Sequence, residues 1–161
     1  MKCRIDKRPC KVFLNFGKMP IANGFIKKSN FKKEYFFNMK IAFNKRLSLF
    51  QLEKNPNPKK MFNKDYPFFT SSSKFMILHF KKFSSWIKKN FNKSKHNFKI
   101  LEIGSNDGTF LLNFKKFYHV GVEPSKSVHI KAIKNKINSK NKFFDNNFVK
   151  EFIKKILNSM S

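Results

Sequence analysis

The residues of this chain best suited to bind a ligand lie in one short segment. Residues 102–108 read Glu-Ile-Gly-Ser-Asn-Asp-Gly, and they end a compact apolar run that begins at residue 98 and is typical of a buried strand. Gly104 and Gly108 tolerate positive φ, so a ligand can approach the backbone closely. A helix that starts after such a turn points free N–H groups at the ligand. The segment therefore predicts a ligand-binding turn between a strand and a helix.

A second acidic residue, Glu123, directly follows the next predicted strand, residues 118–122. Ligands of open α/β sheets bind just beyond the carboxyl ends of the strands, where a carboxylate can accept hydrogen bonds from both hydroxyls of a ribose. The alternative is that Glu102 and Glu123 are ordinary capping or surface acids. Only nine Asp and Glu occur in the whole chain, however, and three of them lie at these strand ends and turns.

The chemistry of the turn favours one cofactor over another. A dinucleotide-binding fold would have G-x-G-x-x-G at this place, with the pyrophosphate on the helix N-terminus. Here Asp107 would repel a pyrophosphate, but it suits the cationic sulfonium and amino groups of S-adenosylmethionine (SAM). We therefore predict a SAM site, with Glu102 or Asp107 near the methionine part and Glu123 on the ribose. The complete predicted cofactor site is Glu102, Gly104, Ser105, Asn106, Asp107, Gly108 and Glu123.

The surrounding pattern predicts an α/β fold. After the first strand we expect helical spacing over residues 109–117, a strand at 118–122, a helix over 125–136, a strand near 142–144 and a helix over 148–157. Alternating strands and helices at this spacing indicate βαβ units and a parallel sheet. The sequence therefore predicts the N-terminal half of a Rossmann-like sheet.

Two further parts precede that sheet. Residues 1–70 contain short apolar clusters separated by Gly, Pro and Asn, which predicts a small β-rich module. Ser71, Ser72 and Ser73 can cap a helix that runs to about residue 92. The predicted division is 1–70 for the module, 71–96 for the connecting helix and 97–161 for the partial SAM-binding domain.

The charge suggests another class of function. The net charge is +27, but of the 36 basic residues only Arg4, Arg8 and Arg46 are arginines. Arginine is the residue that reads bases and clamps phosphates in two-point contacts. Lys, Asn, Phe and Ile are also the residues that an AT-rich genome accumulates. A Lys-rich nucleic-acid-binding protein stays an alternative, but we expect only non-specific contact with polyanions.

The chain lacks an apolar run long enough for a signal peptide or a membrane span. Its two cysteines do not suggest a disulfide framework. We therefore expect a cytoplasmic protein with no membrane partner.

Five ordered segments resemble SAM-dependent sugar C-methyltransferases that carry an N-terminal zinc-binding module. E-I-G-S-N-D-G followed by G-V-E-P-S is similar to the cofactor motif of that family. The upstream likenesses are F-G-K-M-P-I-A-N at residues 16–23, L-F-Q-L at 49–52, and M-F-N-K-D-Y at 61–66 followed by the serines at 71–73.

The resemblance implies methyl transfer from SAM to carbon 3 of a nucleotide-linked keto-deoxysugar. It places Tyr66 in a motif near the active site, although a core-edge aromatic is an equal alternative for this residue. It also implies further strands and a catalytic cluster after residue 161. We therefore expect the chain to be a truncated enzyme that is inactive alone, or the non-catalytic subunit of a split methyltransferase whose sheet a second chain completes.

The same resemblance implies a zinc site built from two C-x-x-C arms. Cys3 fits the first arm, but Asp6 stands at its partner position, and Asn44 and Leu47 stand where the second arm would fall. Two cysteines cannot make a four-thiolate site. A site of Cys3 and Cys10 with help from Asp6 or a histidine is the alternative. The prediction is that this module holds no structural zinc.

Overall fold

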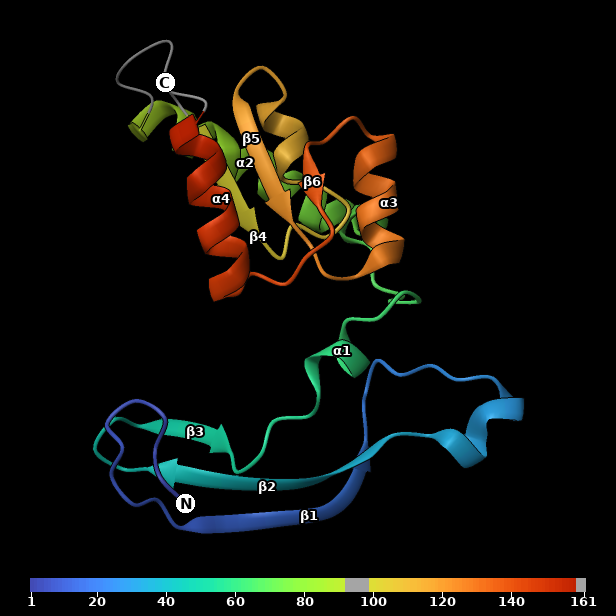
Figure 1. Ribbon diagram of the computed structural model, residues 1–161, viewed down its shortest axis with the longest axis vertical. Coiled ribbons are helices and arrows are strands. Elements are labelled where there is room, and N and C mark those ends of the chain that lie inside the picture. Colours follow the sequence, from blue (N-terminus) through green and yellow to red (C-terminus); the bar gives the residue numbers. More distant parts are fainter. Residues whose placement is uncertain (92–98, 159–161) are drawn as a thin grey trace. The chain divides into compact units, whose positions relative to one another are not determined.

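The computed structural model describes residues 1–91 and 99–158 (Figure 1). The chain divides into two compact units, Met1–Phe62 and Asn63–Ser161. The predicted 71–96 segment and the predicted strand from residue 98 both extend into residues 92–98, which lie outside the described residues.

The first unit is built on a small antiparallel sheet. Its strands are β1 (Val12–Pro20), β2 (Phe36–Asn44) and β3 (Leu49–Leu52), in the order β1-β2-β3. The helical segments of this unit are short: η1 (Lys28–Lys33) and α1 (Pro58–Met61). This arrangement confirms the small β-rich module expected from the sequence.

The second unit alternates strands and helices around a parallel sheet (Figure 1). After η2 (Thr70–Ser72) its elements are α2 (Lys74–Phe91), β4 (Lys99–Ile103), η3 (Leu111–Phe114), β5 (Tyr118–Val122), α3 (Lys126–Lys134), β6 (Ser139–Lys140) and α4 (Asn146–Asn158). The strands lie side by side in the order β4-β5-β6, and both pairings are parallel. Ser73 caps α2, because its Oγ accepts a hydrogen bond from the backbone N–H of Met76 at 3.2 Å. The α/β prediction with a parallel sheet is confirmed.

The predicted helix over 109–117 is wrong in extent, because only the 3₁₀ segment η3 forms there. The side chain of Asn113 explains the difference. Its Nδ2 donates to the carbonyl oxygens of Thr109 and Phe110 at 3.3 and 3.0 Å. Side-chain amides that take these carbonyls compete with the hydrogen bonds of a continuing α-helix.

The third strand also differs from its predicted place at 142–144. The structure has β6 at Ser139–Lys140, where Gly121 and Val122 of β5 pair with it. Phe144 lies instead in the loop before α4, with its ring centroid 5.7 Å from that of Phe148. Packing of the aromatic pair therefore takes Phe144 out of the sheet.

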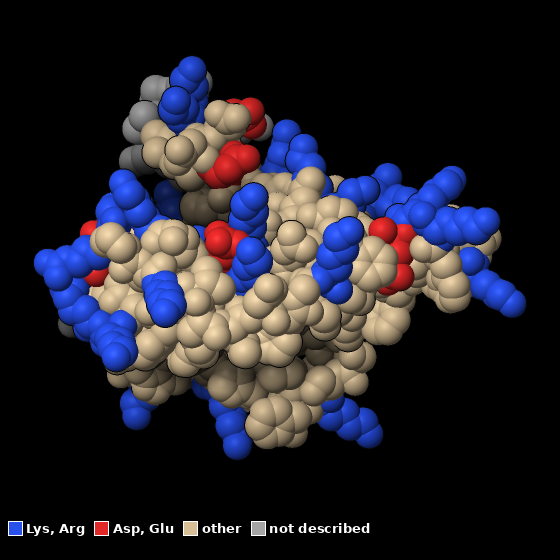
Figure 2. Space-filling view, turned by 90° about the horizontal axis from the view of Figure 1, so that it is seen from below, with Lys and Arg blue, Asp and Glu red and all other residues tan. Residues whose placement is uncertain are grey.

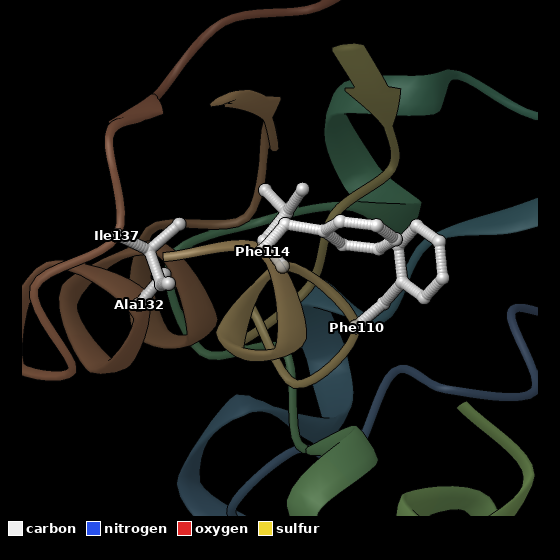
Figure 3. Close-up of a cluster of buried hydrophobic side chains, with 5 residues drawn as sticks. Phe110, Phe114, Ala132 and Ile137 are labelled. Carbon is white, nitrogen blue, oxygen red and sulfur yellow. The ribbon is translucent and has the colours of Figure 1, made fainter. Parts of the chain in front are cut away.

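One face of the parallel sheet packs on the main core of the second unit. The core residues Phe110, Leu111, Phe114, Ala132 and Ile137 are buried, and Ile100 of β4 packs against them. In Figure 3 the rings of Phe110 and Phe114 meet at one end of this cluster, and Ala132 and Ile137 lie at the other. Burial of each large apolar side chain contributes roughly 1.5–3 kcal/mol.

The opposite face of the sheet is covered by α4. Val120 and Val122 of β5 form a second buried cluster with Phe148, and Phe152 packs against it. The parallel register puts Leu101 and Ile103 of β4 beside these valines, yet both stay exposed, at 41% and 57%. The sheet therefore has helical elements on both faces, and β4 is partly uncovered on the α4 side.

Candidate functional site

The turn after β4 is fixed by the neighbouring strand. The backbone N–H groups of Gly104 and Ser105 both donate to the carbonyl of Val122, at 2.8 and 3.2 Å, and so continue the β4–β5 pairing into the turn. Gly104, Asn106 and Gly108 then adopt φ of 72°, 49° and 77°. Such angles favour glycine and are tolerated by asparagine.

The two glycines of this turn have different surroundings. A Cβ added at Gly104 would meet no atom within 4 Å, so open space lies beside the backbone there. A Cβ at Gly108 would lie 2.8 Å from Cγ1 of Ile137. Gly108 is therefore needed for packing against the core, whereas Gly104 leaves room for a ligand.

Glu123 joins the turn after β4 to the start of α3. Its carboxylate is 5% exposed and accepts hydrogen bonds from the backbone N–H groups of Asn106, at 2.9 Å, and Ser125, at 2.7 Å. Asn141 in turn donates to the carbonyl of Glu123 at 2.8 Å. The carboxylate thus lies at the carboxyl end of β5, in the position predicted for it.

Asp107 is completely buried and fully engaged. Its Oδ1 accepts from the Oγ1 of Thr109 at 2.6 Å, and its Oδ2 accepts from the backbone N–H of Ser71 at 2.9 Å. Burial by itself would raise the pKa of Asp107, but the hydrogen bonds from Ser71 and Thr109 outweigh it and hold the pKa below its usual value. Asp107 is therefore an ionised group inside the unit.

The carboxylate of Glu102 differs from those of Glu123 and Asp107, because one of its oxygens accepts no hydrogen bond from the described residues. Its Oε2 is buried and has no hydrogen-bond partner among the described residues. Burial, together with the nearby carboxylates of Asp107 and Glu123, raises the pKa of Glu102 to about 8. A cation placed here would relieve the repulsion among these acids and favour the ionised form of Glu102.

Two hydroxyls around the turn share this lack of partners. The Oγ atoms of Ser105 and Ser125 are buried and find no hydrogen-bond partner within the described part of the chain. Buried polar atoms are normally paired, so each of these unpaired atoms is a candidate for contact with a ligand or a water molecule. Ser105 belongs to the predicted cofactor site, whereas Ser125 was predicted only as the start of a helix.

The turn is also tied to the segment before α2, a contact that sequence analysis missed. Asn106 donates through Nδ2 to the carbonyl of Phe68 at 2.9 Å and accepts through Oδ1 from the backbone N–H of Thr70 at 2.9 Å. Ser127 of α3 donates to the carbonyl of Tyr66 at 2.7 Å. Tyr66 is therefore held beside the start of α3, with its ring edge-on to that of Phe68 at 5.6 Å between centroids.

The positions that resemble zinc ligands lie in the first unit, and they meet without forming a donor set for a metal. The Nδ2 of Asn44 lies 3.1 Å from one carboxylate oxygen of Asp6 and 3.2 Å from the other. Leu47 packs against the buried side chains of Cys3 and Cys10. Among the described residues, no group of three or more His, Cys, Asp and Glu is arranged to hold a metal ion.

The surroundings shift the pKa values of Asp6 and Cys10 in opposite directions. Hydrogen bonds from the Cys3 thiol, Asn44 and Arg46 hold the pKa of Asp6 well below its usual range. Burial and the neighbouring Cys3 raise the pKa of the Cys10 thiol.

The net charge of the chain is +27. Figure 2 shows lysine and arginine side chains spread around one face of the molecule, with acidic groups between them. No helix in the described part of the chain has both the length and the apolar character needed to span a membrane.

A comparison with protein-family models found a match to the first unit. Residues 3–62 match a methyltransferase family model, Methyltransf_13, described as "Putative zinc binding domain". The matched segment nearly coincides with the first compact unit, Met1–Phe62. A search of the curated proteins found no match. The match supports a methyltransferase-associated module in the first unit, similar to a zinc-binding domain.

Proposed function

We propose that the Asn63–Ser161 unit binds SAM at the turn of residues 104–108, as the cofactor half of a sugar C-methyltransferase. The observation that carries this proposal is the buried Oε2 of Glu102, which lacks a partner among the described residues and lies near two further carboxylates. A small ligand with positive charge would complete this site, whereas a pyrophosphate would meet three acids.

Each part of the cofactor has a counterpart in the turn. Gly104 has open space beside its backbone, so the cofactor would come closest to the main chain there. Glu102 and Asp107 provide the negative surroundings for the amino and sulfonium groups. Glu123 lies at the carboxyl end of β5, where its carboxylate can hold the ribose hydroxyls.

The order of the strands supports the same assignment. β4, β5 and β6 are parallel, adjacent and consecutive, as we expect for the first half of a Rossmann-like class I methyltransferase sheet. The methyltransferase-associated module at residues 3–62 favours a methyltransferase over a dehydrogenase.

We further propose that the acceptor is a nucleotide-linked keto-deoxysugar, methylated at carbon 3. When bound, SAM supplies an electrophilic methyl group on its sulfonium. The carbon next to the sugar ketone must lose a proton before it can attack that methyl group, so a base is needed beside it. Tyr66, whose backbone is tied to α3, is the candidate of this chain for the substrate side of that step.

Isothermal titration calorimetry with SAM tests the cofactor assignment on the whole chain. We expect micromolar binding to the native protein and loss of binding in Gly104→Ala, because the added methyl group fills the space that the cofactor needs. Gly17→Ala is a matched control, since Gly17 also has φ of 72° and nothing within 4 Å of an added Cβ, but lies in β1.

A second variant addresses the ribose contact. Glu123→Ala should also abolish binding, with circular dichroism as the check that the turn still forms, because Glu123 holds two backbone N–H groups. A folded native chain that gives no heat with SAM, or that binds NAD equally well, would contradict the assignment.

A further inference from the structure

Two turns of the first unit share their spacing and a residue with positive φ at the same place, although different hydrogen bonds close them. In one, Cys3 and Asp6 are followed by Lys7 at φ of 60°; in the other, Asn44 and Leu47 are followed by Ser48 at φ of 49°. The first turn is closed by the backbone N–H of Lys7, which donates to the carbonyl of Cys3 at 3.0 Å. The second is closed by the backbone N–H of Ser48, which donates to the carbonyl of Lys45 at 3.4 Å. Between the two turns, the side chain of Asn44 contacts that of Asp6.

A carboxylate occupies the centre between the turns. Both oxygens of Asp6 accept from the Nδ2 of Asn44, at 3.2 and 3.1 Å. The guanidinium of Arg46 adds two contacts to Oδ2, from Nε at 3.1 Å and from Nη2 at 2.9 Å. The backbone N–H of Arg8 donates to Oδ1 at 3.2 Å. Asp6 is thus bonded to its own turn and to the opposite one.

The orientation of Asn44 shows that this contact is made between two protein groups. Its Oδ1 accepts from the backbone N–H of Leu47 at 3.2 Å, which turns the Nδ2 donor toward Asp6. A metal would need an oxygen lone pair at that place, and Leu47 offers no donor atom at all. Asn44 is 7% exposed, so its hydrogen bonds to the carboxylate are largely shielded from water.

Apolar packing and a second polar contact support the same junction. Cys3, Cys10 and Ala42 are buried together, and Leu47 packs against them as one small apolar cluster. On β3, the Oε1 of Gln51 accepts from the backbone N–H of Arg4 at 3.1 Å, which holds the first turn to the sheet.

We propose that Asp6, Asn44 and Arg46 form a metal-free clasp that joins the N-terminal turn to the β2–β3 hairpin, in place of a structural zinc ion. The ion pair with Arg46 is the outer part, because the Arg46 side chain is 53% exposed. The inner part is the Asp6–Asn44 pair. The fold of this unit is therefore independent of metal, and it depends on the charge of one carboxylate.

The first arm of the test uses the native chain. The protein is expressed with added zinc, dialysed, and analysed for metal content, and its thermal unfolding is followed with and without a strong chelator. We expect no stoichiometric zinc and an unchanged Tm. Bound zinc at one ion per chain, or a Tm lowered by the chelator, would overturn the proposal.

The second arm removes the charge. Asp6→Asn keeps the shape of the side chain, and we expect the Tm of the first unit to fall by about 4 °C or more, with faster hydrogen exchange in β2 and β3. Glu53→Gln is the matched control, because Glu53 forms an ion pair with Lys40 at 3.5 Å in the same unit but joins no turns. Equal Tm and equal exchange in the two variants would contradict the clasp.

The third arm restores the missing thiols. In the triple variant Asp6→Cys, Asn44→Cys and Leu47→Cys, the two turns carry four cysteines with Cys3. We expect this variant to take up one zinc ion and to lose its fold when the chelator is added. A folded triple variant that binds no zinc would show that the turns do not meet at a metal-sized centre, and the clasp would not stand in place of the ion.

Discussion

The carboxylate of Asp107 lies 2.9 Å from the backbone N–H of Ser71, so an acid of the glycine turn holds the segment before α2. The same carboxylate accepts from the hydroxyl of Thr109 at 2.6 Å. Asp107 therefore has a structural task in addition to the charge that we assign to it in cofactor binding.

Replacement of Asp107 by alanine should destabilise the second unit strongly. It leaves the buried hydroxyl of Thr109 and the partly buried N–H of Ser71 without an acceptor, and each such loss costs about 1–3 kcal/mol. We expect the free energy of unfolding to fall by about 3 kcal/mol in urea titrations. Asp65→Ala, at an exposed acid of the same unit, should change it by less than about 0.5 kcal/mol. Similar values for the two variants would mean that the Asp107 contacts carry no stability.

Alanine at Gly108 should destabilise the fold more than alanine at Gly104. Gly108→Ala puts a methyl group 2.8 Å from Ile137 at a positive φ, so overpacking and strain together should cost roughly 2–4 kcal/mol. Gly104→Ala has the strain without the clash and should cost only about 1–2 kcal/mol. Chemical denaturation of both variants measures this difference, and a larger loss in Gly104→Ala than in Gly108→Ala would contradict it.

These glycines also show what the sequence can and cannot predict. Their spacing after an apolar run predicted the strand and the turn that follows it, because strand periodicity and glycine punctuation are local properties. The different tasks of Gly104 and Gly108 depend on Ile137, which is far away in the sequence. Contacts of this kind follow from the packing of the chain and leave no local pattern.

The same limit explains the predictions that were wrong. Residues 109–117 have helical spacing, but the amide of Asn113 takes backbone carbonyls and only η3 forms. Phe143 and Phe144 have strand propensity, but Phe144 packs on Phe148 instead. In both cases a side-chain contact outweighs propensity. The network around Asp6 was equally out of reach, since Arg46 lies 40 positions away along the chain.

The pH dependence of stability should report on Glu102. Its pKa is about 8 in the folded protein, against 4.5 as the ordinary value, so between these values the folded state holds a proton that the unfolded state has lost. Stability must then fall as the pH rises from about 5 to 8, by at most about 1.4 kcal/mol per pH unit. Glu102→Gln should flatten this part of the curve. Unfolding curves at several pH values test it, and a native profile with the same slope as that of Glu102→Gln would contradict the assignment.

Cofactor binding should be linked to the same proton. A bound cation favours the ionised form of Glu102, so the affinity for SAM should increase with pH between about 5.5 and 7.5, by up to about tenfold per unit. Calorimetry in buffers of different ionisation enthalpy should show the release of a proton to the solvent. The comparison with Glu102→Gln removes the contribution of SAM's own amino group. If the affinity for SAM changes with pH in the same way in the native chain and in Glu102→Gln, Glu102 does not take part in cofactor binding.

Binding to nucleic acid should depend steeply on salt. The positive charge is mostly lysine and is spread over the surface that Figure 2 shows, so contacts with phosphates should be numerous and non-specific. For about six such contacts the affinity should fall roughly 10³-fold between 50 and 200 mM salt. Fluorescence anisotropy with labelled duplexes of unrelated sequence measures this, and we expect the same curve for each. An affinity that persists at 200 mM salt, or that separates one sequence from another by about 100-fold, would instead favour a nucleic-acid-binding protein, because lysine-driven contact alone cannot produce either result.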